Sequence, residues 1–93
     1  MSDLISASEI ETLMKKVPEW ELEEKSITRS VEFDEFLEGI DFVDGVAEIA
    51  EEAQHHPDID IRWRKVHLLL TTHSAGGLTA KDFELAARFD ALV

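Results

Sequence analysis

The sequence predicts an α+β domain that spans residues 1–93, in which three helices cover a four-stranded antiparallel sheet in the order α-β-β-α-β-β-α. Three observations lead to this fold class. Apolar residues recur at helical spacing in three segments, they alternate with polar residues in four short runs, and the two runs of each pair are joined by a connection of hairpin length. A chain of 93 residues with 44% hydrophobic residues is sufficient for a single core.

The first helix is expected from about Ala7 to Val17. Ser6 and Glu9 have the spacing of a capping box, in which two side chains bind backbone N–H groups of the first turn. Pro18 prevents the helix from continuing. Its apolar side consists of Ile10, Leu13, Met14 and Val17, with Ile5 and Ile10 spaced as a hydrophobic staple.

The first hairpin is expected directly after this helix. Trp20 and Leu22 alternate with glutamates, which predicts one strand, and a polar connection follows at residues 24–26. The second strand has its apolar residues on a single parity, and these are Ile27, Val31 and Phe33.

The longest periodic segment begins after Asp34, which is suited to act as its N-cap, and runs to about Gln54. It has two apolar rows, although one row is enough to cover a sheet. Together with Gly39 and Gly45, the second row indicates close approach by another helix, while a single wide face on the sheet is an equally open alternative. One row contains Phe36, Ile40, Val43, Ala47 and Ala50, and the other contains Phe42, Val46, Ile49 and Ala53.

The second hairpin is expected after Pro57. Because proline disfavours helical backbone for the preceding residue, the long helix should end at His55 and His56, which then lie at a helix-to-strand junction. Ile59 and Ile61 alternate with charged residues, and a turn follows near 63–65. The next strand has Val66, Leu68 and Leu70 on one parity and His67, Leu69, Thr71 and His73 on the other.

The last helix is expected from Ala80 to about Leu92. Residues 74–77 interrupt the preceding strand, and Thr79 and Asp82 form a second capping box. Its inner side is expected to contain Phe83, Ala86 and Ala87.

The charge balance restricts the classes of partner. With 21 acidic and 9 basic residues, the net charge of −12 would repel a phosphate backbone or an anionic lipid surface. The chain has no cysteine, so disulfides and thiolate chemistry are excluded. No apolar stretch reaches the length of a membrane span, and residues 1–5 lack the basic start of a signal peptide. We therefore expect a cytoplasmic protein that binds neither nucleic acid nor membrane.

The basic cluster at residues 62–65 contains Trp63, an aromatic residue on which a base could stack. In a chain with this net charge, we interpret the cluster as a charged hairpin turn that blunts a sheet edge.

Four histidines lie between positions 55 and 73, in a chain without tyrosine or cysteine. Imidazoles are the side chains best suited to proton transfer near neutral pH. Glu51 precedes His55 by four residues, a helical spacing at which a carboxylate can orient an imidazole. We expect a site where the long helix, the strand ending at His73 and the helix beginning near Asp82 meet.

Each of these candidates has a structural alternative. From local spacing alone, Glu51 fits a solvated residue of an acidic helix face, Asp82 fits a capping carboxylate, and His67 fits a half-exposed strand residue. A zinc site built from three histidines and two carboxylates is a further alternative, but no HExxH pair or comparable ligand spacing supports it.

The pattern Glu51-x3-His55-His56-Pro57-x5-Trp63-x9-His73-x8-Asp82 resembles the signature of the pterin-4a-carbinolamine dehydratases. The resemblance covers nearly the whole chain and implies the same α+β fold. It also implies a lyase that removes water from 4a-hydroxytetrahydropterin, gives quinonoid dihydropterin, and so recycles the pterin cofactor of aromatic amino-acid hydroxylases. No metal or other cofactor is implied for the enzyme itself.

The resemblance also implies roles for individual residues. His55 and His73 would be the acid/base groups, while His56, also among the catalytic residues, would chiefly hold the ring. Glu51 and Asp82 would orient the imidazoles. The implied substrate contacts are Trp20, His56, Thr72 and Ser74.

Two positions depart from the family pattern. Glu19 replaces the usual glycine before Trp20, which concerns the pocket entrance, and Arg64 replaces a frequent asparagine in a turn. Some family members also bind a homeodomain transcription factor through the long helix. This implies an alternative function as a non-catalytic dimerisation cofactor, although the same helix would serve a homodimer or homotetramer, which is our default expectation.

Overall fold

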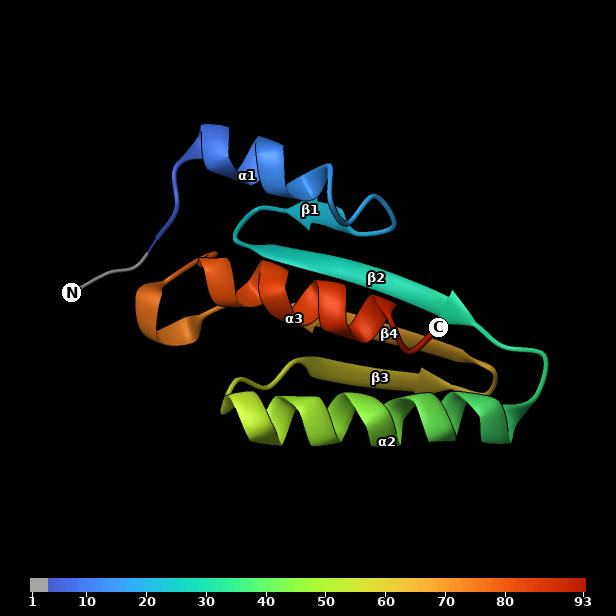
Figure 1. Cartoon of the computed structure of the whole chain (residues 1–93). Coiled ribbons are helices and arrows are strands. Elements are labelled where there is room, and N and C mark those ends of the chain that lie inside the picture. The colour runs from blue at the N-terminus through green and yellow to red at the C-terminus, as the bar shows by residue number, and fades with distance from the viewer. Residues whose placement is uncertain (1–3) are drawn as a thin grey trace.

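The computed structural model describes residues 4–93 and confirms the predicted α+β class and the order of the elements (Figure 1). The four strands form one antiparallel sheet in the order β1-β2-β4-β3. The strands are β1 (Glu21–Glu23), β2 (Ser26–Glu32), β3 (Asp58–Arg62) and β4 (Lys65–Leu70). The helices are α1 (Ala7–Met14), α2 (Phe36–Ala53), α3 (Ala80–Asp90) and the 3₁₀ helix η1 (His73–Ala75).

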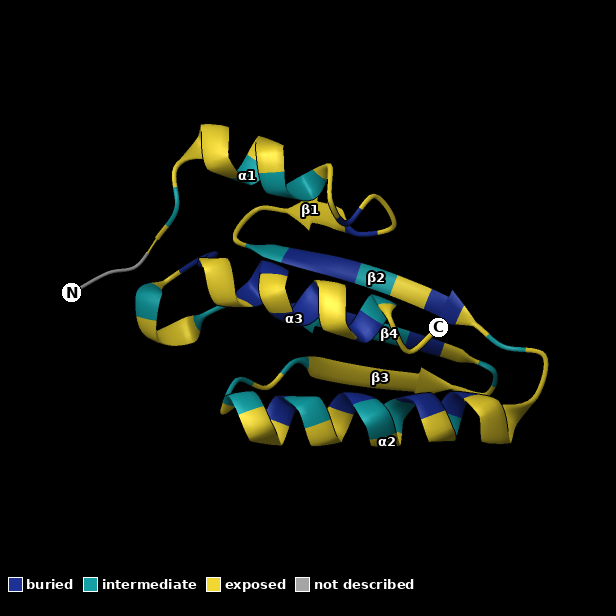
Figure 2. Cartoon of the chain, in the orientation of Figure 1, coloured by how far each residue is buried: buried dark blue, intermediate teal, exposed yellow. Residues whose placement is uncertain are grey.

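The core lies between the helices and one face of the sheet. Along β4 every second side chain is buried, whereas the side chains between them are exposed or half-buried, because helices cover only one face (Figure 2). The register pairs Ile27 of β2 with Leu70 of β4, and Val31 with Val66, so both strands contribute to the same face. From the helices, the core includes Phe42, Val46, Phe83, Leu85, Ala86 and Phe89.

Helix α1 ends at Met14, three residues before the expected Val17. The next N–H groups bond to carbonyls three residues back, so the chain tightens into turns ahead of Pro18. The capping box at its start is confirmed, since the Glu9 N–H donates to Ser6 Oγ at 3.2 Å.

The N-cap of α2 is Glu35, and the prediction of Asp34 was wrong. Glu35 has extended backbone, and its N–H donates to Glu38 Oε1 at 2.9 Å, which completes a capping box. At the other end, Gln54 adopts left-handed backbone with φ 52°. The chain therefore leaves the helical path before it reaches His55.

Of the two apolar rows of α2, the row with Phe42 and Val46 is the better buried, and in the row that begins with Phe36 only Ala50 is buried. The rest of this row, here called the outer row, is less buried, since Phe36 and Ala47 are exposed and Ile40 and Val43 are half-buried. At the two glycines the close neighbours are side chains of this chain: a Cβ at Gly45 would lie 3.0 Å from Leu92, which follows the end of α3, and one at Gly39 would lie 3.4 Å from Phe33. Side chains of the same chain thus make the close approach.

The segment after β4 differs from the prediction. The strand ends at Leu70, and Thr72 forms an isolated bridge with Gly77. His73 therefore does not end a strand but begins η1, the turn that this bridge closes.

Helix α3 begins at Ala80 as predicted and ends at Asp90, two residues before the expected Leu92. Ala87 is exposed, contrary to the prediction, because the buried side of the helix is centred on other positions. Its buried residues are Asp82, Phe83, Leu85, Ala86 and Phe89.

Within residues 4–93, no helix is long and apolar enough to cross a membrane. The expectation about the N-terminal segment rests on residues 1–5, of which 1–3 lie outside the described residues.

Candidate active site

The centre of the candidate site is a pair formed by His55 and Asp82. Asp82 lies in the first turn of α3 with its side chain fully buried, and His55 Nε2 lies 2.6 Å from Asp82 Oδ1. The imidazole itself is only 11% exposed. Because a buried carboxylate is costly without partners, we expect this contact to govern the position of both side chains.

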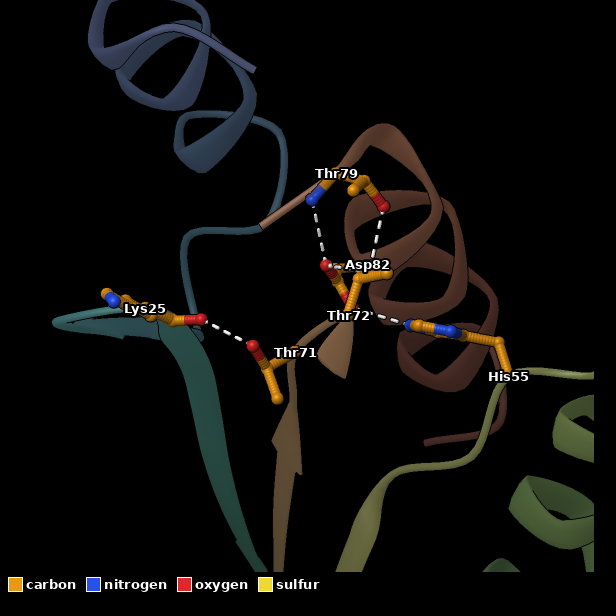
Figure 3. A network of polar contacts seen from close by, with 6 residues as sticks. All are labelled: Lys25, His55, Thr71, Thr72, Thr79 and Asp82. Carbon is orange, nitrogen blue, oxygen red and sulfur yellow. Dashed lines mark hydrogen bonds and ion pairs between the residues drawn. The ribbon is translucent and has the colours of Figure 1, made fainter. Parts of the chain in front are cut away.

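The second oxygen of Asp82 binds two further donors (Figure 3). Oδ2 accepts the Thr79 N–H at 2.9 Å and the Thr72 hydroxyl at 2.8 Å. The capping bond and the imidazole contact thus use different oxygens of one carboxylate. Both roles considered for Asp82 in the sequence are therefore present together.

The pairing determines which ring nitrogen of His55 is left for a ligand. An ionised carboxylate can only accept hydrogen bonds, so Nε2 carries the proton in this contact. Nδ1 has no hydrogen-bond partner among the described side chains. In catalytic triads, too, a carboxylate bonded to one ring nitrogen fixes the tautomer of the imidazole.

A second pair, His56 and Glu51, lies at the surface next to the first. His56 Nε2 is 2.5 Å from Glu51 Oε2, and the two side chains are 56% and 73% exposed. The helical spacing predicted His55 as the partner of Glu51, which was wrong. The left-handed backbone of Gln54 turns the chain off the helix, so that His56 contacts Glu51 and His55 does not.

His73 lies close in sequence to this network but does not bind it directly. The side chain is exposed in η1, and no hydrogen bond or ion pair joins it to His55 or Asp82. It lines an open cavity of about 400 Å³ together with Lys25, Leu69, Thr71 and Gly77. The residue before it, Thr72, provides the connection to Asp82.

Trp20 is not brought to the imidazoles. Its indole is buried, and Nε1–H donates at 2.8 Å to Asp90 Oδ1, at the end of α3 opposite to Asp82. Arg29 Nη1 binds the same oxygen at 2.5 Å. In the described structure, the contacts of Trp20 therefore hold the first hairpin against the last helix.

The remaining sequence candidates lie near the network or outside it. Thr72 is half-buried and bonded to Asp82, whereas Ser74 is exposed in η1. His67 is the half-exposed strand residue that the sequence indicated, with Nδ1 at 2.7 Å from Ser30 Oγ on the uncovered face of the sheet.

Sequence reasoning missed Thr71 and Lys25. The Thr71 hydroxyl donates to the Lys25 carbonyl at 2.6 Å, which ties the turn between β1 and β2 to the segment before His73 (Figure 3). Thr71 shares its strand parity with His73, a signal that could have identified it. Lys25 is brought there by the pairing of β2 with β4, and local sequence contains no comparable signal.

The residues of the described chain do not assemble a metal-binding cluster. Across positions 4–93, no group of three or more histidine or carboxylate side chains is arranged to hold a metal ion. The chemistry that this arrangement supports is proton transfer by imidazoles.

Fold and site together define a small α+β protein with a buried histidine–carboxylate pair, and comparison with known proteins gives its family. The family model described as Pterin 4 alpha carbinolamine dehydratase matches residues 3–92. The chain therefore belongs to this family.

Curated relatives agree with this assignment. The chain is 48% identical over 92 residues to a protein of Picosynechococcus sp., covering 99% of this chain and 100% of the relative. It is 52% identical over 84 residues to a protein of Acidobacterium capsulatum, covering 90% and 91%. Both relatives have a provisional assignment as pterin-4-alpha-carbinolamine dehydratase.

Two solved structures are similar. A transcriptional coactivator/pterin dehydratase from Brucella Melitensis aligns with a TM-score of 0.91 at 29% identity, covering 95% of this chain and 96% of that chain. A pterin dehydratase-like protein described as a RuBisCO assembly factor of the alpha-carboxysome aligns with a TM-score of 0.65 at 24% identity, covering 78% and 84%. At that identity the second likeness concerns the fold alone.

Proposed function

We propose that this protein removes water from 4a-hydroxytetrahydropterin by general acid/base catalysis with histidine. The observation that carries the proposal is the His55–Asp82 pair, in which a fully buried carboxylate holds one imidazole nitrogen at 2.6 Å. Membership of the family supports a pterin as the substrate. The proposal includes cytoplasmic recycling of the pterin cofactor of aromatic amino-acid hydroxylases, as the resemblance implies.

The reaction requires two proton transfers and no redox change. The bond between C4a and the hydroxyl oxygen breaks, and a proton donated to that oxygen lets it leave as water. A base removes the proton on N5, and the electrons of that N–H bond form the C4a=N5 double bond of quinonoid dihydropterin. One proton is given and one is taken, so the enzyme returns to its starting charge.

We assign the donating step to His55. Asp82 holds Nε2 of this imidazole, and Nδ1 faces no competing protein partner within residues 4–93. His73 has no carboxylate partner in the described chain and is assigned the accepting step. His56 and Glu51, both exposed, are assigned to holding the pterin ring.

The test is a dehydration assay that follows loss of the carbinolamine absorbance after hydroxylase turnover. Wild-type protein should accelerate this loss equally with and without chelator, and His55→Gln and His73→Gln should each slow it. Failure of the wild type to accelerate the loss would contradict the dehydratase function. Inhibition by chelator would instead point to a metal.

We also propose that the outer row of α2 is an interface with a second copy of the chain. Phe36 is exposed, as is the neighbouring Leu37, while Ile40 and Val43 are only half-buried. This row gives α2 more apolar surface than the sheet covers. Size-exclusion chromatography with light scattering should show a homodimer or homotetramer, and Ile40→Glu should convert it to monomer. A wild-type monomer would contradict this interface. The outer row of α2 would then be a candidate surface for binding a different protein.

A further inference from the structure

Thr72 links the two parts of the candidate site. Its hydroxyl lies 2.8 Å from Asp82 Oδ2, beside the contact between Asp82 and His55. Its backbone closes the turn that contains His73, because the Thr72 N–H donates to the Gly77 carbonyl at 3.0 Å and the Thr72 carbonyl accepts the N–H of Gly76 at 3.0 Å. A single residue thus contacts the partner of one proposed acid/base histidine and holds the turn of the other.

The direction of the hydrogen bonds around Thr72 follows from the single proton that each hydroxyl can donate. A hydroxyl has one proton to donate, and an ionised carboxylate can only accept. The proton of the Thr72 hydroxyl therefore goes to Asp82. Thr79 Oγ1 lies 2.9 Å from Thr72 Oγ1, so its hydroxyl must donate to Thr72. The result is a directed chain from Thr79 through Thr72 to Asp82.

These hydrogen bonds complete the set of donors around the Asp82 carboxylate, which has no access to water. Asp82 is fully buried, and its oxygens accept from His55, from the Thr79 N–H and from Thr72. If one donor is lost, an Asp82 oxygen keeps a buried lone pair without a hydrogen bond, which lowers the stability of the fold. The carboxylate can then rotate toward its remaining donors. A rotation of Asp82 would move Oδ1, the atom that holds His55.

We propose that Thr72 is a positioning residue for the dehydration, which acts on His55 through Asp82 and on His73 through the backbone of the turn. This differs from the substrate contact that the resemblance implied for Thr72, and it rests on the proposed dehydratase function. The hydroxyl of Thr72 is directed to the carboxylate, so its own proton is not available to a ligand.

The experiment compares Thr72→Val, which keeps the branched shape and the backbone bonds, with Thr72→Ser, which keeps the hydroxyl. Thr28→Val is the matched control, because it removes a threonine hydroxyl by the same substitution at a buried position within β2, outside the hydrogen-bond network. Each protein is assayed for kcat and KM. The imidazole proton on Nε2 of His55 is followed by ¹H–¹⁵N NMR without substrate, after confirmation by circular dichroism that each variant is folded.

We expect Thr72→Val to lower kcat by roughly tenfold to 100-fold with KM changed less than about threefold, because proton transfer is disturbed more than binding. The His55 Nε2 proton signal should shift or exchange faster. Thr72→Ser should restore both readouts, and Thr28→Val should match the wild type.

Three results would overturn the proposal: an unchanged kcat and proton signal in Thr72→Val, a rise in KM alone, or equal damage from Thr72→Ser. An equal loss of kcat in Thr28→Val would show a general effect of removing a threonine hydroxyl and would also contradict the proposal. A wild-type protein without activity would contradict the dehydratase function instead, and the NMR signal would then decide whether Thr72 positions Asp82.

Discussion

Two consecutive histidines form the same kind of pair in opposite surroundings. His55 meets Asp82, a residue 27 positions away in sequence, while His56 meets Glu51, five positions away. The two contact distances differ by only 0.1 Å, at 2.6 and 2.5 Å. Their burial differs greatly, because the side chains of the first pair are 11% and 0% exposed and those of the second are 56% and 73% exposed.

By general electrostatics, two ion pairs with equal contact distances can differ in strength when their burial differs. In water two opposite charges about 4 Å apart gain roughly 1 kcal/mol, and several times more in the less polar surroundings of a protein. An exposed pair also loses side-chain freedom and is screened by salt. We therefore expect the buried pair to determine proton transfer, and the exposed pair to contribute contacts that a ligand can replace.

Asp82→Asn should have the largest effect, because it replaces the buried carboxylate that holds Nε2 of His55. We expect kcat for dehydration to fall by roughly 100-fold or more, and the free energy of unfolding to fall by about 1–3 kcal/mol as hydrogen bonds to a buried group are lost. Steady-state kinetics and urea denaturation measure the two effects.

The matched control is Asp90→Asn at the other end of α3. Asp90 also accepts hydrogen bonds from two side chains, Trp20 and Arg29, but none from a proposed catalytic group. It should lose stability while kcat stays within about threefold of the wild type. Equal losses of kcat in the two variants would show that Asp82 acts only through the stability of α3.

We expect the next largest difference in kinetics between substitutions of His55 and His56. His55→Gln retains a hydrogen-bond donor but cannot transfer a proton, so kcat should fall by roughly 100-fold. His56→Gln should mainly raise KM, by less than about tenfold, because an exposed imidazole is assigned to holding the ring. The same assay measures both, and a larger loss of kcat in His56→Gln would reverse the assignment.

Glu51→Gln should have a small effect. The pair that it breaks is exposed, so we expect the free energy of unfolding to change by less than about 0.5 kcal/mol and kcat by less than about threefold. Thermal unfolding and the dehydration assay would detect more. A loss as large as that of Asp82→Asn would mean that the surface pair closes around the substrate.

Trp20→Phe should have the smallest effect on catalysis. It removes the indole N–H that binds Asp90, so stability should fall by about 1 kcal/mol. The kinetic constants should stay unchanged, because this contact lies at the end of α3 opposite to Asp82. An increase in KM without loss of stability would restore the substrate contact that the family resemblance implies.

The elements of the fold were predictable because local rules determine them. The capping box at Thr79 and Asp82 identified the start of α3, and the alternation along β4 identified its buried face. The site was less predictable, because one residue with unusual backbone decided its pairing. Glutamine normally continues a helix, so nothing at Gln54 indicated the left-handed turn that exchanges His55 for His56 as the partner of Glu51.

Contacts between distant segments were the least accessible from sequence. The spacing of Gly39 and Gly45 indicated a close approach but not its source, and the contacting residues proved to be Phe33 and Leu92 of the same chain. Trp20 likewise has a buried hydrogen bond to Asp90, 70 residues away, which no local pattern could indicate.

The most direct test of the account is a pair of double-mutant cycles on the dehydration kcat, one for His55→Gln with Asp82→Asn and one for His56→Gln with Glu51→Gln. If the buried pair acts as one unit, its double variant should be scarcely slower than the worse single variant, while the effects in the exposed pair should multiply. Multiplying effects in the His55–Asp82 cycle, or equally strong coupling in the His56–Glu51 cycle, would contradict the claim that the buried pair determines proton transfer.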